Sequence, residues 1–201
     1  MAQRGRKKGS DGEKSRALLL RVAADEFAEH GYHETKISTI VHKANVTQPT
    51  FYLYFKSKKA IFEELEDLFR VKLACLIMNS LLDERLDNTL LPDRITEGLT
   101  VIFQFFSDHR SLARIGFYVS PSATDVKAQI ATQIEINLSK EAAAGYFHSH
   151  VDMALVAHGL VGMIEGLTLT KLWTGEKTAH ELAKNIVMLL LYGLKREVSI
   201  K

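Results

Sequence analysis

Apolar residues recur at helical spacing along most of this 201-residue chain, and this spacing constrains its fold more than any other feature. Two early stripes with i, i+3, i+4 and i+7 or i+8 spacing are Leu19, Val22, Ala23 and Phe27, and then Ile37, Ile40, Val41 and Ala44. Such a stripe buries one face of an α-helix, whereas a half-buried strand needs strict alternation, which no segment shows. With 12 Gly and 3 Pro, the chain is also poor in turn residues. The sequence therefore predicts an all-α fold.

The stripes and the cap residues at their ends divide the chain into helices. We expect helices over residues 16–30, 37–44, 48–54, 57–82, 92–108, 110–118, 122–147, 151–173 and 178–197. Gly31 and Asn45 stand where a residue with positive φ ends a helix. Thr47 and Ser57 are N-cap types, and Pro49 is tolerated in a first helical turn.

Charge is distributed unevenly along the chain. Residues 1–60 contain 12 Lys and Arg against 6 Asp and Glu, whereas residues 61–201 contain 14 against 18. A basic third facing a polyanion explains this asymmetry, and so does an uneven solvated surface. We expect a basic flexible arm at residues 1–15, a small helical domain at 16–60 and a larger helical domain at 61–201.

Several functional classes lack their sequence signals. No apolar leader follows the basic N-terminus, and the apolar run 185–194 falls short of the ~20 residues of a membrane span, so a cytoplasmic protein without membrane contact is expected. The lone Cys75 fits a reducing compartment. No catalytic motif is present, and we assign no catalytic residues. His148, His150 and Asp152 have metal-ligand spacing, but a helix junction with an N-capping Asp explains them better, so no metal or cofactor is predicted.

Two short helices joined by a tight turn, behind a longer amphipathic helix, form the pattern of a helix-turn-helix unit. The second helix of such a unit enters the major groove of DNA and needs short polar side chains on its exposed first turn. Thr47, Gln48, Thr50 and Tyr52 meet this requirement, because hydroxyls and amides reach base edges and phosphates.

The residues of this region also resemble a known family. Phe27, Gly31, Tyr32, Thr35, Ile37, Ile40, Ala44 and Val46, and the run 47–58 with its aromatic block before Lys-Ser-Lys, resemble the N-terminal domain of TetR-family transcriptional regulators. Lys36, Asn45 and Lys59 depart from the family's usual residues. The resemblance implies that Thr47, Gln48, Pro49, Thr50 and Tyr52 lie at the groove and that Tyr54 and Lys58 bind phosphates. Thr35, Lys36 and Lys43 are further candidates for DNA contact.

Basic residues outside the predicted recognition helix bear on DNA binding as well. Lys58 and Lys59 stand in the first turn of the helix 57–82, where the macrodipole disfavours a cation by about 0.3–1 kcal/mol. A phosphate over that helix N-terminus would compensate, and two tolerated solvated lysines are the alternative. Arg4 and Arg6 of the arm are expected to follow the minor groove, unless the arm is an inert tail.

A helix-turn-helix unit that reads a specific sequence usually acts in pairs on a palindrome, so a homodimer is expected. The last two long helices are the best candidates for the interface, because three mid-helix glycines indicate close helix approach, either within the subunit or across a dimer. The candidate interface residues are Leu155, Gly159, Gly162, Met163, Gly166, Leu182, Ile186 and Leu189.

The middle helices combine aromatic residues with isolated polar groups, as small-molecule pockets do. The family resemblance implies an effector cavity here, so a lipophilic effector is expected, although each aromatic taken singly is better explained as core. The candidate ligand-binding residues are Phe103, Gln104, Phe106, His109, Phe117 and Glu165.

Together these features predict a three-helix helix-turn-helix DNA-binding domain followed by a larger ligand-binding and dimerisation domain. The predicted function is a DNA-binding regulator, a repressor that a small molecule releases from a double-stranded, palindromic operator. A regulator of this fold that recruits polymerase or answers to a protein partner is one alternative. A second alternative is a helical small-molecule binding protein without sequence-specific DNA binding. A third is an enzyme hidden in the C-terminal helices.

Overall fold

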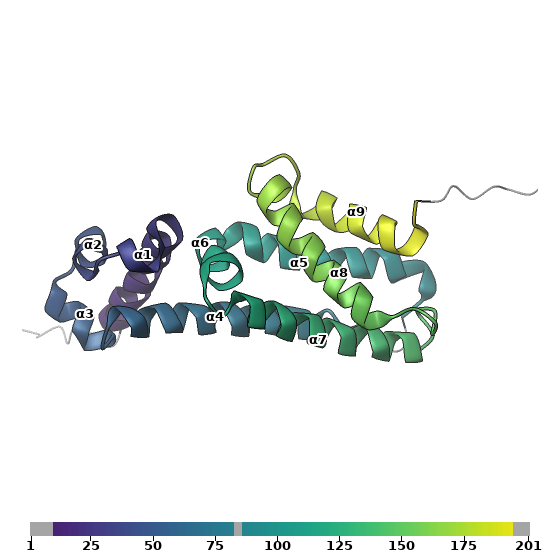
Figure 1. Cartoon of the computed structure of the whole chain (residues 1–201), viewed down its shortest axis with the longest axis horizontal. Helices are drawn as coiled ribbons and strands as arrows, with labels where there is room; N and C mark the ends of the chain where they lie inside the picture. The colour runs from purple at the N-terminus through teal and green to yellow at the C-terminus, as the bar shows by residue number, and fades with distance from the viewer. Residues whose placement is uncertain (1–9, 83–85, 195–201) are drawn as a thin grey trace, which may run out of the picture. The chain divides into compact units, whose positions relative to one another are not determined.

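The computed structural model describes residues 10–82 and 86–194 and is shown in Figure 1. Every regular element in these two ranges is a helix, and none of their residues forms a strand. The predicted all-α fold is therefore confirmed. The chain divides into two compact units. One combines the described residues up to Phe69 with Ser111–Pro121, and the other combines the described residues of 70–110 with those from Ser122 onward.

The first unit is built on α1 (Ser10–Glu34), α2 (Ile37–Lys43), α3 (Gln48–Tyr54) and the first half of α4 (Lys58–Asn79). Its core is aromatic: Phe27, Phe51 and Phe69 are completely buried. Phe62 packs against Phe27 edge to face with ring centroids 5.0 Å apart. These contacts hold α1 and α4 together and give the short helices α2 and α3 a rigid support.

The ends of α2 and α3 follow the local signals in the sequence. Thr47 caps α3, and Ser57 caps α4 by accepting a hydrogen bond from the Ala60 N–H at 3.1 Å. Asn45 has a φ of 52° in the turn between α2 and α3, as predicted. Gly31 also has a positive φ, 80°, but its ψ of 168° lies outside the left-handed helical region, and the chain resumes a helical turn to Glu34.

A short segment from later in the chain completes the first unit. Arg110–Arg114 forms α6, and Ile115–Val119 forms the π-helix η2, which packs against α1. Gly116 lies so close to Phe69 that a Cβ atom there would be 2.2 Å from the ring. The Ser120 hydroxyl donates to the Glu66 carboxylate at the end of this segment.

The second unit contains the remaining helices. They are the rest of α4, the 3-10 turn η1 (Asn88–Leu90), α5 (Leu91–Asp108), α7 (Ala123–Ala143), α8 (Met153–Leu167), the π-helix η3 (Thr168–Leu172) and α9 (Ala179–Tyr192). Within it, α5 packs against α9 and α7 packs against α8 (Figure 1). Asp152 caps α8 by accepting from the Leu155 N–H at 3.1 Å, as predicted.

Several helix ends differ from those predicted. α1 begins at Ser10, six residues early, because its first turns bury no apolar stripe and periodicity cannot detect them. α4 ends at Asn79 rather than near residue 82. α7 and α9 end at Ala143 and Tyr192, because Gly145 and Gly193 have φ of 90° and 67° and interrupt the helices. The end predicted for the last helix, residue 197, lies outside the described residues.

No membrane span was expected from the sequence, but by length and composition alone the continuous stretch Met153–Leu172 could cross a membrane. Core helices of soluble proteins meet the same test. Ala157, Leu160 and Ile164 of this stretch are buried, and Glu165 accepts a hydrogen bond from Lys127 of α7 at 2.5 Å. One side of the stretch thus packs within the second unit, and 28% of its most apolar window is buried.

Candidate DNA interface and ligand cavity

The exposed side of α3 carries the polar residues predicted to contact DNA. Thr47, Gln48 and Pro49 are exposed, and Tyr52 exposes 50% of its surface. Thr50 is half-buried, and its hydroxyl lies 2.9 Å from that of Thr47. The structure therefore brings hydroxyl, amide and phenol groups together on one short helix.

The opposite side of α3 is anchored in the core. Phe51 is completely buried and Phe55 is 2% exposed. The Phe51 ring contacts both neighbouring aromatic rings, Tyr52 edge to face at 5.4 Å and Phe55 at 5.6 Å. The polar side of α3 is thus presented on a backbone that packing holds in place, as base recognition requires.

The remaining predicted DNA-contact residues have diverse surroundings. Thr35 is only 2% exposed, and its hydroxyl lies within hydrogen-bond distance of the Gly31 and Glu26 carbonyls, at 2.8 and 3.1 Å. Lys36 is exposed and precedes α2, and Tyr54 is half-buried. Arg4 and Arg6 lie outside the described residues. Thr35 therefore has little surface to offer a ligand, whereas Lys36 is accessible.

Lys58 is held by the backbone at the end of α1. Its Nζ donates to the carbonyls of Tyr32, Thr35 and His33 at 2.8, 2.9 and 3.2 Å, and it also lies 4.6 Å from the centroid of the Tyr32 ring. Because an ammonium has three protons, these carbonyls use all its donors. The three carbonyl oxygens offset the unfavourable interaction of the Lys58 cation with the macrodipole of α4. The sequence had predicted a phosphate in this role.

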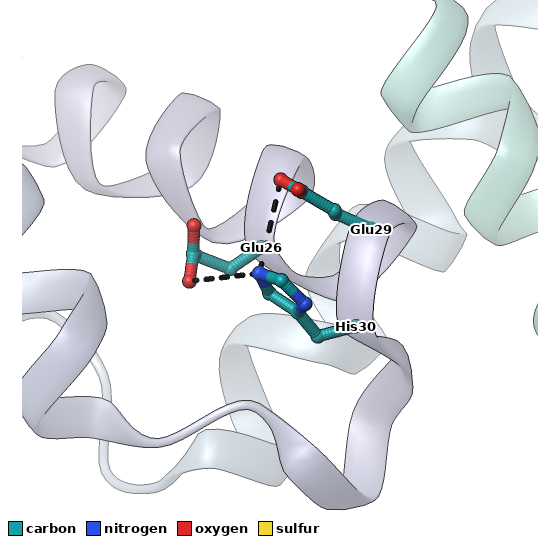
Figure 2. Close-up of side chains that lie close together, drawn as sticks. All are labelled: Glu26, Glu29 and His30. Carbon is teal, nitrogen blue, oxygen red and sulfur yellow. Dashed lines mark ion pairs between the residues drawn. The ribbon is translucent and has the colours of Figure 1, made fainter.

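Lys43 forms an ion pair with Glu26, a carboxylate that is 2% exposed. The hydrogen bond to Glu26 raises the pKa of Lys43. Figure 2 shows that Glu26 also lies beside His30 and Glu29 on α1, with His30 Nε2 4.0 Å from Glu26 and 3.7 Å from Glu29.

These three α1 side chains offer ligand atoms within 4.8 Å of one another, a spacing that could hold a metal ion. Lys43 already neutralises the buried carboxylate, so the cluster is explained by its ion pairs.

A cavity of about 380 Å³ lies within the second unit, at the lower end of the range for small-molecule sites. Its wall is mostly aliphatic and includes Ile77, Leu99, Ile134, Leu160 and Val187. Five lining residues carry polar side chains: Ser80, Asn137, Glu141, Tyr146 and His148. Asn137 and Glu141 lie on the buried face of α7, one helical turn apart, and each is 7% exposed.

Backbone groups bond four of the five polar side chains of the wall: Ser80, Asn137, Glu141 and Tyr146. The Ser80 hydroxyl and the Asn137 amide donate to the Ile77 carbonyl at 2.8 and 2.9 Å. Glu141 accepts from the Leu82 N–H at 3.0 Å, and burial raises its pKa. The bonds of Asn137 and Glu141 fasten the last turn of α4 and the chain after it to α7.

None of the six predicted ligand-binding residues lines this cavity. Phe103, Phe106 and Phe117 are at most 1% exposed and fill the cores of their units. Gln104 donates to Asp108 at 2.7 Å on the surface, and His109 packs against Phe105. Glu165 forms an ion pair with Lys127. The ligand contacts of all six residues remain predictions.

The residues predicted for a dimer interface differ in their exposure, and Met163 is half-buried. Leu155 is 71% exposed and Leu189 is 40% exposed, whereas Leu182 and Ile186 are buried in the unit's own core. A Cβ atom at Gly159, Gly162 or Gly166 would meet nothing within 4 Å. The three glycines therefore serve no close approach among the described residues of this chain.

Comparisons with known proteins show what the chain is similar to. Residues 19–65 match the family described as bacterial regulatory proteins, tetR family. An uncharacterized HTH-type transcriptional regulator, YdgC of Bacillus subtilis, is 44% identical over 185 residues, which is 92% of this chain and 95% of the relative. The fatty acid metabolism regulator protein of Bacillus subtilis is 39% identical over 59 residues, which is 29% of each chain.

Solved structures share the fold over nearly the whole chain. The TetR family regulator PfmR of Thermus thermophilus superposes with a TM-score of 0.73 at 20% identity, over 89% of this chain and 99% of that one. FadR of Bacillus subtilis, solved in complex with stearoyl-CoA, gives a TM-score of 0.68 at 20% identity, over 89% and 99% of the two chains.

Proposed function

Because the chain belongs to the TetR family of bacterial transcriptional regulators, we propose that it is a repressor whose α3 reads a palindromic operator. The observation that carries this proposal is the exposed polar side of α3, with Thr47, Gln48 and Tyr52 held outward by the buried Phe51. Thr50, Pro49 and the exposed Lys36 extend the same surface. Hydroxyl and amide side chains of this kind discriminate base pairs in the major groove.

Selection of bound duplexes from a random DNA pool at physiological salt tests this function. We expect a palindrome with half-sites about one helical turn, roughly 34–36 Å, apart. Tyr52→Ala should weaken binding to the selected duplex while leaving helicity unchanged. Val71→Ala, which removes a similarly exposed side chain from α4, is the matched control. Enrichment of no sequence would favour a small-molecule binding protein instead.

The predicted homodimer forms through α8 and α9 in this proposal. The exposed Leu155 and Leu189, together with the open surface over Gly159 and Gly162, support it, because apolar surface without intramolecular cover marks an interface. Sedimentation should give about twice the monomer mass of 22.6 kDa. Leu155→Asp combined with Leu189→Asp should give the monomer mass, and a wild-type chain that sediments as a monomer would refute the dimer.

The effector in this proposal is a small lipophilic molecule bound in the cavity of the second unit. The aliphatic wall and the volume of about 380 Å³ support it. The complex of FadR with stearoyl-CoA shows that one protein of this fold binds an apolar chain. Release requires that the effector bind the DNA-incompetent state more tightly, because a ligand indifferent to the two states shifts nothing. No catalytic step is part of this function, which we place in the cytoplasm.

A further inference from the structure

Among the described residues that line the cavity, Glu141 is the one acidic residue, and none is a Lys or Arg. Its carboxylate can accept about four hydrogen bonds, yet one donor, the Leu82 N–H, reaches it within the described part of the chain. The cavity thus contains a carboxylate that is 7% exposed and has no Lys or Arg beside it among the described residues of the wall.

The other polar side chains of the wall carry no buried negative charge. The Ser80 hydroxyl and the Asn137 amide already donate to the Ile77 carbonyl, and the Tyr146 hydroxyl lies 2.9 Å from the Leu86 N–H and 3.3 Å from the Leu86 carbonyl. His148 is exposed. Glu141 therefore dominates the electrostatics of a cavity whose wall is mostly aliphatic.

We propose that Glu141 makes this cavity selective for apolar ligands that carry one positive charge, such as lipophilic amines. A buried carboxylate without a partner is costly, and a cation placed beside it removes most of that cost. An anionic ligand would instead place two like charges in one apolar cavity. The selectivity is therefore opposite to that expected of a site for fatty acids. This inference rests on the proposed ligand-binding role of the cavity.

Glu141 also has a structural role, since it fastens the chain after α4 through Leu82. The variant Glu141→Gln separates the two roles. Its amide carbonyl can still accept from the Leu82 N–H, whereas its negative charge is gone. Glu135→Gln makes the same chemical change six residues earlier on α7, outside the cavity wall, and is the matched control.

The experiment is titration calorimetry of the full chain with three ligands of one chain length: octylamine, 1-octanol and octanoate. At pH 8, octylamine is a cation and octanoate an anion. We expect octylamine to bind about tenfold or more tightly than 1-octanol, and octanoate to bind most weakly. Glu141→Gln should remove the preference for octylamine without weakening 1-octanol, and Glu135→Gln should behave as the wild type.

Two different failures can be distinguished. If 1-octanol binds as tightly as octylamine, or if Glu141→Gln keeps the wild-type order, the selectivity is refuted while the cavity remains a ligand site. If none of the three compounds binds, both the selectivity and the proposed lipophilic effector site are refuted.

Discussion

Lys58 provides a direct test of how the DNA-binding unit is held together. Its ammonium bonds three carbonyls at the end of α1, so removing it leaves these acceptors and the start of α4 without their link. A hydrogen bond to a charged group contributes about 1.5–3 kcal/mol. Counting the two part-buried bonds, to Tyr32 and Thr35, at the low end of this range gives about 3 kcal/mol for Lys58→Met.

The neighbouring Lys59 is the matched control. It is exposed and pairs with Glu63 at 3.2 Å on the surface of α4, an interaction of the class that contributes 0–1 kcal/mol. Lys59→Met removes the same charge from the same helix turn, so the two variants share any effect of the macrodipole.

Urea denaturation of the two full-length variants, followed by circular dichroism, measures the difference. With a slope of about 2 kcal/mol per molar urea, Lys58→Met should lower the midpoint by about 1 M or more, and Lys59→Met by less than about 0.5 M. Equal midpoints would show that the three carbonyl bonds contribute nothing to stability, and the phosphate interpretation of Lys58 would then regain its basis.

Three further predictions concern the packing and electrostatics of the fold. Gly116→Ala forces a Cβ atom against the buried Phe69 ring and should cost about 1–3 kcal/mol by chemical denaturation; Gly116→Ala with Phe69→Leu should recover part of this loss, and an unchanged midpoint in the single variant would contradict the close contact. Thr178→Ala removes the capping box with Glu181 at the start of α9 and should cost about 1 kcal/mol, a loss that thermal unfolding would detect. The raised pKa of Glu141 means that the folded chain retains a proton which the unfolded chain loses above the ordinary value of 4.5, so this group lowers stability as pH rises. Glu141→Gln should therefore raise the melting temperature at pH 8 and leave it unchanged at pH 4, and an equal gain at both pH values would rule out this cause.

The sequence predicted α2, α3 and the start of α4 well because the signals for these elements are local. Thr47 and Ser57 cap the helices that follow them, and Asn45 has the positive φ that its side chain tolerates. Each of these features depends on residues within a few positions of one another, so no knowledge of tertiary contacts was needed.

Lys58 shows where local reasoning stops. Its place in the first turn of α4 demanded a compensating partner, and the sequence offered a phosphate. The structure supplies carbonyls of residues more than 20 positions earlier in the chain, brought there by the packing of α1 on α4. The phosphate contact stays a prediction, but nothing in the energetics of α4 now requires it.

The amino-acid composition of the middle helices did not predict which residues line the cavity. Aromatic density drew attention to Phe103 and Phe106, which fill the core, because close packing leaves large rings few voids to border. A signal for the true wall was present but subtle: Asn137 and Glu141 continue the buried stripe of Ile130 and Ile134 on α7. Polar residues on such a stripe need partners. Asn137 donates to the Ile77 carbonyl in the last turns of α4, Glu141 accepts from the Leu82 N–H after α4, and both residues line the cavity.

By itself, then, the sequence determined the all-α class, the order of the helices and the polar side of α3, since periodicity and caps act over a few residues. Only the tertiary structure decided that Lys58 bonds backbone carbonyls, which face of α7 borders the cavity and which side chains of α8 and α9 stay exposed. These features depend on contacts between segments far apart in the chain, and no local pattern specifies which segments meet.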